Sequence, residues 1–329
     1  MRFSILAACL LVSISVAQQD DIKKSVFRSE SSVVLVPTLV KDEKGGLVYG
    51  LQAKDFVIED DGVEQVAQLD DTAESQPISL VIAIQTGRRA AREFGRMRGL
   101  RSVLEPILNS PHVESAVLFF DSHLDLALDF TNNSAAVAQR LQSLTPGDGG
   151  AAIVDALDLS VKLLSKRAEQ RRRVLLLVSE TRDHGSRWAR QLEEIVARIG
   201  NSNVVVYALA FSPSKSQVLD TMRGTNRDEG RTTADIFAVV ALTTNAMRRN
   251  IPKTVASMTG GEYGVFESLK GFETQIIAFD NHLYNRYLLS FQPKNARPGL
   301  HQIHVRLREA GKGTVMARSN YWASTGSQQ

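Results

Sequence analysis

Cysteine is nearly absent from this chain, since Cys9 is the one cysteine among 329 residues. A chain with one thiol forms no internal disulfide, and removal of the leader described below would also take away its thiol chemistry. Charge of one sign is equally scarce, because 39 Lys and Arg face 36 Asp and Glu, a formal net charge of +3. So small an excess of positive charge does not favour a nucleic-acid partner.

The common motifs of catalysis and phosphate binding are also missing. The chain contains no Gly-x-Ser-x-Gly, no Walker loop and no His-Glu-x-x-His. The glycine-rich segment 147–150 lacks the lysine that follows such glycines in a phosphate-binding loop, so it predicts a tight turn. The sequence therefore favours a non-enzymatic protein.

The first 17 residues have the pattern of a secretory signal peptide. A basic residue precedes an apolar run at 5–16, and small residues lead to Ala17. We expect cleavage after Ala17, which predicts a secreted or periplasmic protein. The apolar run is too short to span a bilayer comfortably. Residues 6–9 resemble a bacterial lipobox ending at Cys9, but hydrophobic sequence continues beyond it. Ordinary cleavage is therefore favoured, and membrane contact is expected only through an uncleaved or lipidated leader.

The rest of the chain divides into segments of different texture. Residues 26–75 are rich in β-branched residues and turn clusters, which predicts an N-terminal β segment. Residues 76–280 alternate strand-length apolar runs with amphipathic stretches. Residues 281–323 return to a strand pattern, and the polar tail 324–329 is expected to be disordered. Because each outer segment has too few strands to bury a core alone, we expect the two to form one small antiparallel β-sandwich.

The alternation in residues 76–280 predicts a doubly wound α/β fold with a mostly parallel sheet. Residues 174–178 are apolar on both faces, as a sheet covered by helices on each side requires. The expected strands span residues 79–85, 115–121, 124–130, 174–180, 204–211 and 262–266. The expected helices span residues 89–108, 135–144, 152–168 and 187–199. A polar stretch followed by an apolar helical one predicts a loop and helix insertion at residues 213–250.

Short segments in a characteristic order run through nearly all of the chain beyond the leader. They occupy residues 36–42, 50–51, 55–56, 60–65, 80–86, 119–122, 129–131, 149–150, 155–156, 259–261, 287–293, 301–303 and 317–321. In this order they resemble the acidobacterial VWFA-related family, exported proteins in which a von Willebrand factor A-type domain lies between β segments. The resemblance implies a Rossmann-like A-type domain that binds a ligand at the carboxyl ends of its strands.

The resemblance also implies where a metal-dependent adhesion site would lie. In A-type domains a first loop supplies Asp-x-Ser-x-Ser, a second supplies Thr and a third supplies Asp, and their oxygens surround one Mg²⁺. This chain departs at all five positions, which hold Gln85, Gly87, Arg89, Ala151 and Glu180. Only Glu180 retains a carboxylate. Because magnesium requires near-octahedral oxygen coordination, we expect no Mg²⁺ and no other cofactor here.

Two interpretations of Arg89 remain open. Its guanidinium can replace the cation and pair with Glu180, because a fixed fork of donors matches a carboxylate. Alternatively, Arg89 points into solvent from the first turn of a helix. A cation near a helix N-terminus opposes the helix dipole and gains nothing there without an anionic partner.

The predicted function is binding of an unknown protein or envelope surface ligand by a metal-free A-type domain. The predicted partner-binding face comprises Arg88, Arg89, Arg92, Asp148, Glu180, Asp183 and His184. Four-residue spacing of Arg88, Arg92 and Arg96 predicts a positive stripe on a helix, or simply a solvated outer face.

Two other functions remain open. One is metal-dependent adhesion with Asp148, Glu180 and Asp183 as substitute ligands, and the other is a structural scaffold of the cell envelope. His301 and His304 lie three apart in an expected strand, so their side chains leave opposite faces and cannot share a metal ion.

Overall fold

The computed structural model describes residues 33–70, 76–187, 191–211, 236–294, 297–309, 311 and 313–323. All of them fall in one compact unit. The predicted leader at residues 1–17, residues 213–235 of the predicted insertion and the tail at 324–329 lie outside the described residues.

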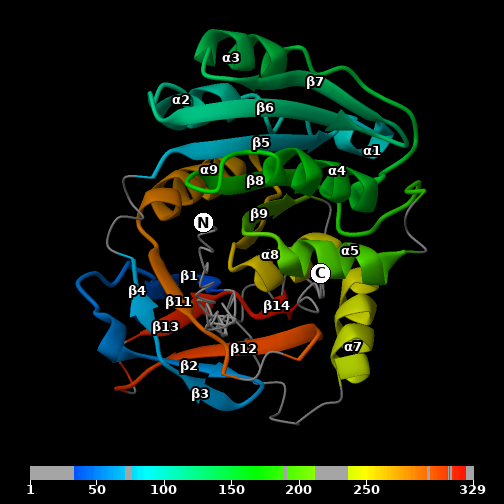
Figure 1. The fold of residues 1–329 in the computed structure, drawn as a ribbon. Helices are drawn as coiled ribbons and strands as arrows, with labels where there is room; N and C mark the ends of the chain where they lie inside the picture. The colour runs from blue at the N-terminus through cyan, green and yellow to red at the C-terminus, as the bar shows by residue number, and fades with distance from the viewer. Residues whose placement is uncertain are drawn as a thin grey trace, which may run out of the picture. The chain divides into compact units, whose positions relative to one another are not determined.

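A six-stranded sheet with the order β10-β9-β8-β5-β6-β7 forms the centre of the α/β part (Figure 1). Its strands are β5 (Ile78–Gln85), β6 (Val113–Phe120), β7 (Leu124–Thr131), β8 (Arg172–Ser179), β9 (Val204–Ala210) and β10 (Tyr263–Val265). Every neighbouring pair is parallel except the edge pair of β6 and β7. Strand β5 is buried along its whole length, as a strand covered on both faces must be.

Helices cover both faces of this sheet. They are α1 (Arg88–Ala91), α2 (Leu100–Leu108), α3 (Ser134–Gln142), α4 (Ile153–Ser165), α5 (Leu192–Asn201), α7 (Ile236–Arg249), α8 (Ile251–Thr259) and α9 (Leu269–Tyr284). Apolar residues of α4, α5, α7 and α8 form one buried cluster with alternate residues of β5, such as Val81. Residues of α2, α3 and α9 form the other with the intervening ones, such as Leu80. The predicted doubly wound fold is therefore confirmed. Among the described residues, no helix has the length and hydrophobicity that a membrane crossing requires.

The helices differ from the predictions in three respects. The continuous helix expected at 89–108 is wrong, because α1 ends at Ala91 and α2 begins at Leu100. The intervening turns contain Gly95 and Gly99, and glycine disfavours a helix interior. Helices α8 and α9 follow the insertion and were not predicted. Helix α9 ends at Tyr284, so helix continues into residues that the strand pattern assigned to the C-terminal β segment.

The β-sandwich consists of two antiparallel four-stranded sheets, with the orders β13-β1-β11-β4 and β14-β12-β2-β3. The N-terminal segment supplies β1 (Val34–Lys41), the 3-10 helix η1 (Ala53–Asp55), β2 (Phe56–Asp60), β3 (Val63–Gln65) and β4 (Gln68–Leu69). The C-terminal segment supplies β11 (Tyr287–Phe291), β12 (Gly299–Leu307), β13 (Thr314–Ala317) and β14 (Asn320–Ala323). Both segments contribute to one apolar core, for example through Phe56 and Phe291. The predicted sandwich is confirmed.

Buried ionic contacts join the sandwich to the α/β part. Glu262, directly before β10, lies 3.0 Å from Lys41 Nζ of β1 and 2.9 Å from Arg286. Its carboxylate also contacts His282 Nδ1 at 2.8 Å. Burial alone would raise the pKa of Glu262, but the His282 hydrogen bond and the charges of Arg286 and Lys41 outweigh it and lower the pKa to about 2. The carboxylate is therefore ionised at neutral pH.

Candidate functional site

The candidate site lies where β5 and β8 end. These strands are parallel neighbours, with Ile84 beside Val178, so their carboxyl ends lie at one edge of the sheet. Strand β5 ends at Gln85, and Glu180 directly follows β8. The edge that the resemblance singles out therefore holds Gln85 and Glu180 side by side.

Gln85 and Glu180 form a reciprocal pair of hydrogen bonds. Gln85 Nε2 donates to Glu180 Oε1 at 2.7 Å, and the Glu180 backbone N–H donates to Gln85 Oε1 at 2.9 Å. Gln85 is fully buried and Glu180 is nearly so. The amide thus satisfies the backbone N–H of Glu180 and one oxygen of its carboxylate, both in a buried residue.

Two further cationic or polar groups approach the same carboxylate. Arg89 of α1 places its guanidinium 3.3 Å from Glu180 Oε2, while 71% of its side chain is exposed. His184 Nε2 lies 3.5 Å from Glu180 Oε1. Arg89 therefore combines both sequence-based interpretations, since it contacts Glu180 and reaches into solvent.

The loops around this pair are closely packed. The Arg88 N–H donates to the Asp148 carbonyl at 2.5 Å, which holds the first loop against the second. Ala151 and His184 exchange two backbone hydrogen bonds, which hold the second loop against the third. A Cβ at Gly87 would lie 2.1 Å from the Gly150 carbonyl oxygen. This loop arrangement therefore has no room for a serine at that position.

Two of the three predicted substitute ligands, Asp148 and Asp183, already accept hydrogen bonds from nearby residues. Asp183 Oδ2 accepts the Val154 N–H at 2.9 Å and the Ser186 hydroxyl, so it caps the N-terminus of α4. Asp148 Oδ1 accepts the Gly150 N–H at 2.7 Å and the Ser122 N–H at 3.1 Å. Hydrogen bonds from Ser122 and Gly150 hold the pKa of Asp148 below its usual value. Both carboxylates are engaged inside the loops.

A cluster beside this site escaped the sequence reasoning. His123 Nδ1 lies 3.6 Å from Asp121 Oδ1, 3.8 Å from Asp148 Oδ2 and 3.2 Å from the Ser122 hydroxyl. The signal was Asp121-Ser122-His123 at the end of β6, but the fold was needed to bring Asp148 beside it. A catalytic triad uses one histidine nitrogen for the nucleophile and the other for the carboxylate. Here all three groups face Nδ1, so the arrangement cannot relay a proton in that way.

Exposed arginines flank the strand ends. Arg88 and Arg92 are exposed, like Arg89. The helical stripe expected for Arg88, Arg92 and Arg96 is wrong, because α1 ends at Ala91 and Arg96 pairs with Glu93. The three arginines at 88, 89 and 92 form a short basic cluster instead.

Residues 69–182 match the family model described as the von Willebrand factor type A domain. That match includes β5, β8 and Glu180. No curated protein sequence matches the chain.

Several solved structures are similar to this chain at low identity. The hypothetical protein BatB from Bacteroides thetaiotaomicron is 14% identical, with 62% of this chain and 99% of that chain covered and a TM-score of 0.39. The vWF domain of the type V pili tip protein Mfa5 from Porphyromonas gingivalis is 9% identical, with coverages of 63% and 95% and a TM-score of 0.42. Proximal thread matrix protein 1 from the mussel byssus, with a zinc-occupied MIDAS motif, is 12% identical, with coverages of 70% and 51% and a TM-score of 0.45. Similarity this low supports no statement about ligands.

Proposed function

We propose that this chain is an exported, non-enzymatic binding protein that holds a protein or envelope surface ligand without a metal ion. The binding face comprises Arg88, Arg89, Arg92, Asp148, Glu180, Asp183 and His184. Export rests on the signal-peptide pattern of residues 1–17. The observation that carries the proposal is the state of Glu180, whose carboxylate accepts N–H donors from Gln85 and Arg89.

The donor set at the strand ends does not fit a magnesium ion. A bound Mg²⁺ needs lone pairs directed at it from about six oxygens. Gln85 directs its N–H group at Glu180 and uses its carbonyl oxygen to accept the Glu180 N–H. Arg89 adds a positive charge, and Ala151 has no side-chain oxygen. The Gln85 amide and the Arg89 guanidinium thus occupy the carboxylate oxygens that a cation would otherwise bind.

The charge of the face favours an anionic ligand. Glu180 is paired, and Asp148 and Asp183 are engaged in their loops. Arg88, Arg89 and Arg92 are exposed at these strand ends, as are Arg182 and Arg187 in the loop after β8, and together they outnumber the exposed carboxylate of Asp148. Arginine forks bind carboxylates through two parallel hydrogen bonds, so an acidic surface would complement this face.

The alternative with substitute metal ligands is disfavoured by the same contacts. A cation bound by Asp183 would have to displace the Val154 N–H and so uncap α4, at a cost of about 1 kcal/mol. A cation bound by Asp148 Oδ2 would compete with the Ser122 hydroxyl, which donates to that oxygen. The binding function differs from the scaffold alternative in one testable way: it requires a partner whose binding depends on the arginines.

A crosslinking pull-down from envelope extract tests the proposal. The bait is the wild-type chain or a variant with Arg88, Arg89 and Arg92 changed to Ala. A control variant changes Arg101, Arg248 and Arg249, which are also exposed, so it loses the same charge.

We expect the first variant to lose a partner that the wild type and the control retain. Recovery should be the same in EDTA as in Mg²⁺. Recovery that requires Mg²⁺ or Mn²⁺ would support the metal-dependent alternative, and the absence of any arginine-dependent partner would support the scaffold.

A further inference from the structure

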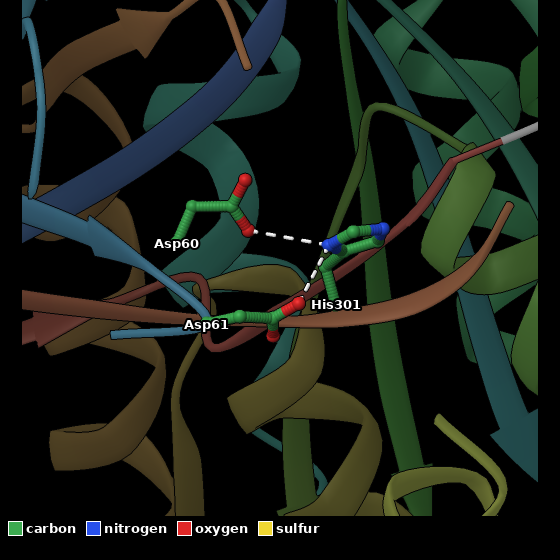
Figure 2. Close-up of side chains that lie close together, drawn as sticks. All are labelled: Asp60, Asp61 and His301. Carbon is green, nitrogen blue, oxygen red and sulfur yellow. Dashed lines mark ion pairs between the residues drawn. The ribbon is translucent and has the colours of Figure 1, made fainter. Parts of the chain in front are cut away.

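Asp60, Asp61 and His301 meet in the β-sandwich where β2 ends, and none of them belongs to the site above (Figure 2). Asp60 ends β2, Asp61 begins the turn to β3, and His301 lies in β12. Strands β2 and β12 are antiparallel neighbours, with Asp60 beside Ile303. The fold thus joins the N-terminal and C-terminal segments at this cluster.

Each of the three side chains uses one polar atom for an outer contact. Tyr321 OH donates to Asp60 Oδ2 at 2.9 Å, and the Gln302 N–H donates to Asp61 Oδ1 at 2.9 Å. His301 Nε2 lies 2.6 Å from the Arg297 carbonyl oxygen, which only accepts, so Nε2 carries a proton. Such contacts are typical of the outer shell that orients metal ligands.

The remaining atom of each side chain is directed inward. His301 Nδ1 lies 3.4 Å from Asp60 Oδ1 and 2.9 Å from Asp61 Oδ2, and Figure 2 shows both carboxylates turned toward that nitrogen. Asp60 Oδ1 and His301 Nδ1 are both buried, and neither has a hydrogen bond of acceptable geometry among the described residues. Unsatisfied buried atoms are rare and call for an explanation.

We propose that Asp60 Oδ1, Asp61 Oδ2 and His301 Nδ1 bind a divalent transition-metal ion, with zinc as the best match. Zinc bonds to histidine nitrogen and carboxylate oxygen at about 2.0–2.2 Å, so its ligand atoms lie roughly 2.9–3.5 Å apart. The measured 2.9 and 3.4 Å agree with that spacing. A mixed nitrogen and carboxylate set suits zinc better than magnesium or calcium, which prefer oxygen alone.

The surroundings leave one side of the cluster open. The Asp61 side chain is 46% exposed, whereas those of Asp60 and His301 are buried. The imidazole ring stacks on Tyr321 with 4.8 Å between ring centroids, which fixes its plane. Three protein ligands with an open fourth position allow a water molecule or a partner group to complete a tetrahedral zinc ion.

Without a metal ion the cluster is a buried ion pair. Burial alone would lower the pKa of His301, but Asp60, Asp61 and the Arg297 carbonyl outweigh it and raise the pKa to about 10. Zinc must therefore displace a proton from Nδ1. A chain that keeps this imidazolium and takes up no zinc would contradict the proposal.

Calorimetry with ZnCl₂ tests the site on the full chain, purified without a polyhistidine tag and stripped with a chelator. We expect one zinc ion per chain. Asp61→Asn should weaken binding by about 100-fold or more, and Tyr321→Phe, which removes only an outer contact, by about 10-fold. Asp61 is the best residue to change because it is exposed and has a φ of 48°, which asparagine tolerates.

Two histidine variants serve as matched controls. His304 lies on the same strand but is exposed, so His304→Asn should bind zinc like the wild type. His123→Asn should also retain binding, and its loss would place the ion at the cluster of Asp121, His123 and Asp148. A wild type without zinc uptake, or an Asp61→Asn variant with wild-type affinity, would overturn the proposal.

Discussion

The carboxylates at the ends of β5 and β8 and those at the end of β2 in the sandwich are in opposite states. Glu180 accepts hydrogen bonds from Gln85 and Arg89, so donors of the protein satisfy its negative charge. Asp60 and Asp61 direct carboxylate oxygens at His301 Nδ1, and Asp60 Oδ1 has no hydrogen bond within the described part of the chain. The comparison suggests a rule for the two proposals: a carboxylate whose oxygens already accept hydrogen bonds is a poor cation ligand, whatever the number of carboxylates nearby.

The difference arises from which residue each strand places opposite the carboxylate. Next to Glu180 the neighbouring strand ends in an amide, which both donates and accepts. Near Asp60, β12 carries His301 and β14 carries Tyr321, and among the described residues only Asp60 Oδ2 has a hydrogen bond, from Tyr321. The carboxylate at the first site is therefore satisfied by protein donors, whereas the second site presents inward-facing atoms to the zinc ion that we propose.

A large loss of stability is expected from removing the amide at the first site. Gln85→Leu keeps the volume but leaves the buried Glu180 N–H and one carboxylate oxygen without Gln85 as a partner. We expect the free energy of unfolding to fall by about 3 kcal/mol, measured by urea denaturation at pH 7. Gln139→Leu, at an exposed position of α3, should change it by less than about 0.5 kcal/mol. Equal stability of Gln85→Leu and wild type would show that Glu180 does not depend on the amide.

Glu262 extends the comparison to a carboxylate that is surrounded by basic side chains, namely Lys41, His282 and Arg286. Its folded pKa of about 2 lies below the unfolded value near 4.5, so its ionised form stabilises the fold above about pH 5. This contribution is lost as pH falls from 5 toward 2. Glu262→Gln should cost about 3 kcal/mol at pH 7, and its difference from wild type should shrink over that pH range.

Denaturation of both proteins at several pH values measures this effect. Glu267→Gln, at an exposed position, is the control and should follow the wild type. A Glu262→Gln difference that stays constant between pH 7 and pH 3 would show that the carboxylate is not held ionised by its neighbours.

The sequence predicted the helices and strands better than it predicted the contacts between side chains. Alternation of apolar runs predicted the sheet, and the motif order placed Gln85 and Glu180 at the strand ends. Loop conformation decides that Asp183 caps α4, and no periodicity encodes it. The cluster of Asp60, Asp61 and His301 was missed because its residues come from opposite ends of the chain. Gln302, the neighbour of His301, is 241 positions from Asp61. The strand pattern separated His301 from His304 but did not identify what His301 faces.

The smallest expected effect concerns Arg89. Because 71% of its side chain is exposed, its ion pair with Glu180 is screened by water, and Arg89→Ala should cost no more than about 1 kcal/mol. At 1 M NaCl, where the screening length is about 3 Å, most of that difference should vanish. Arg92→Ala is the control and should have no effect on stability at either salt concentration. A loss above about 2 kcal/mol would mean that the guanidinium, and not the Gln85 amide, is the main group that replaces a cation beside Glu180.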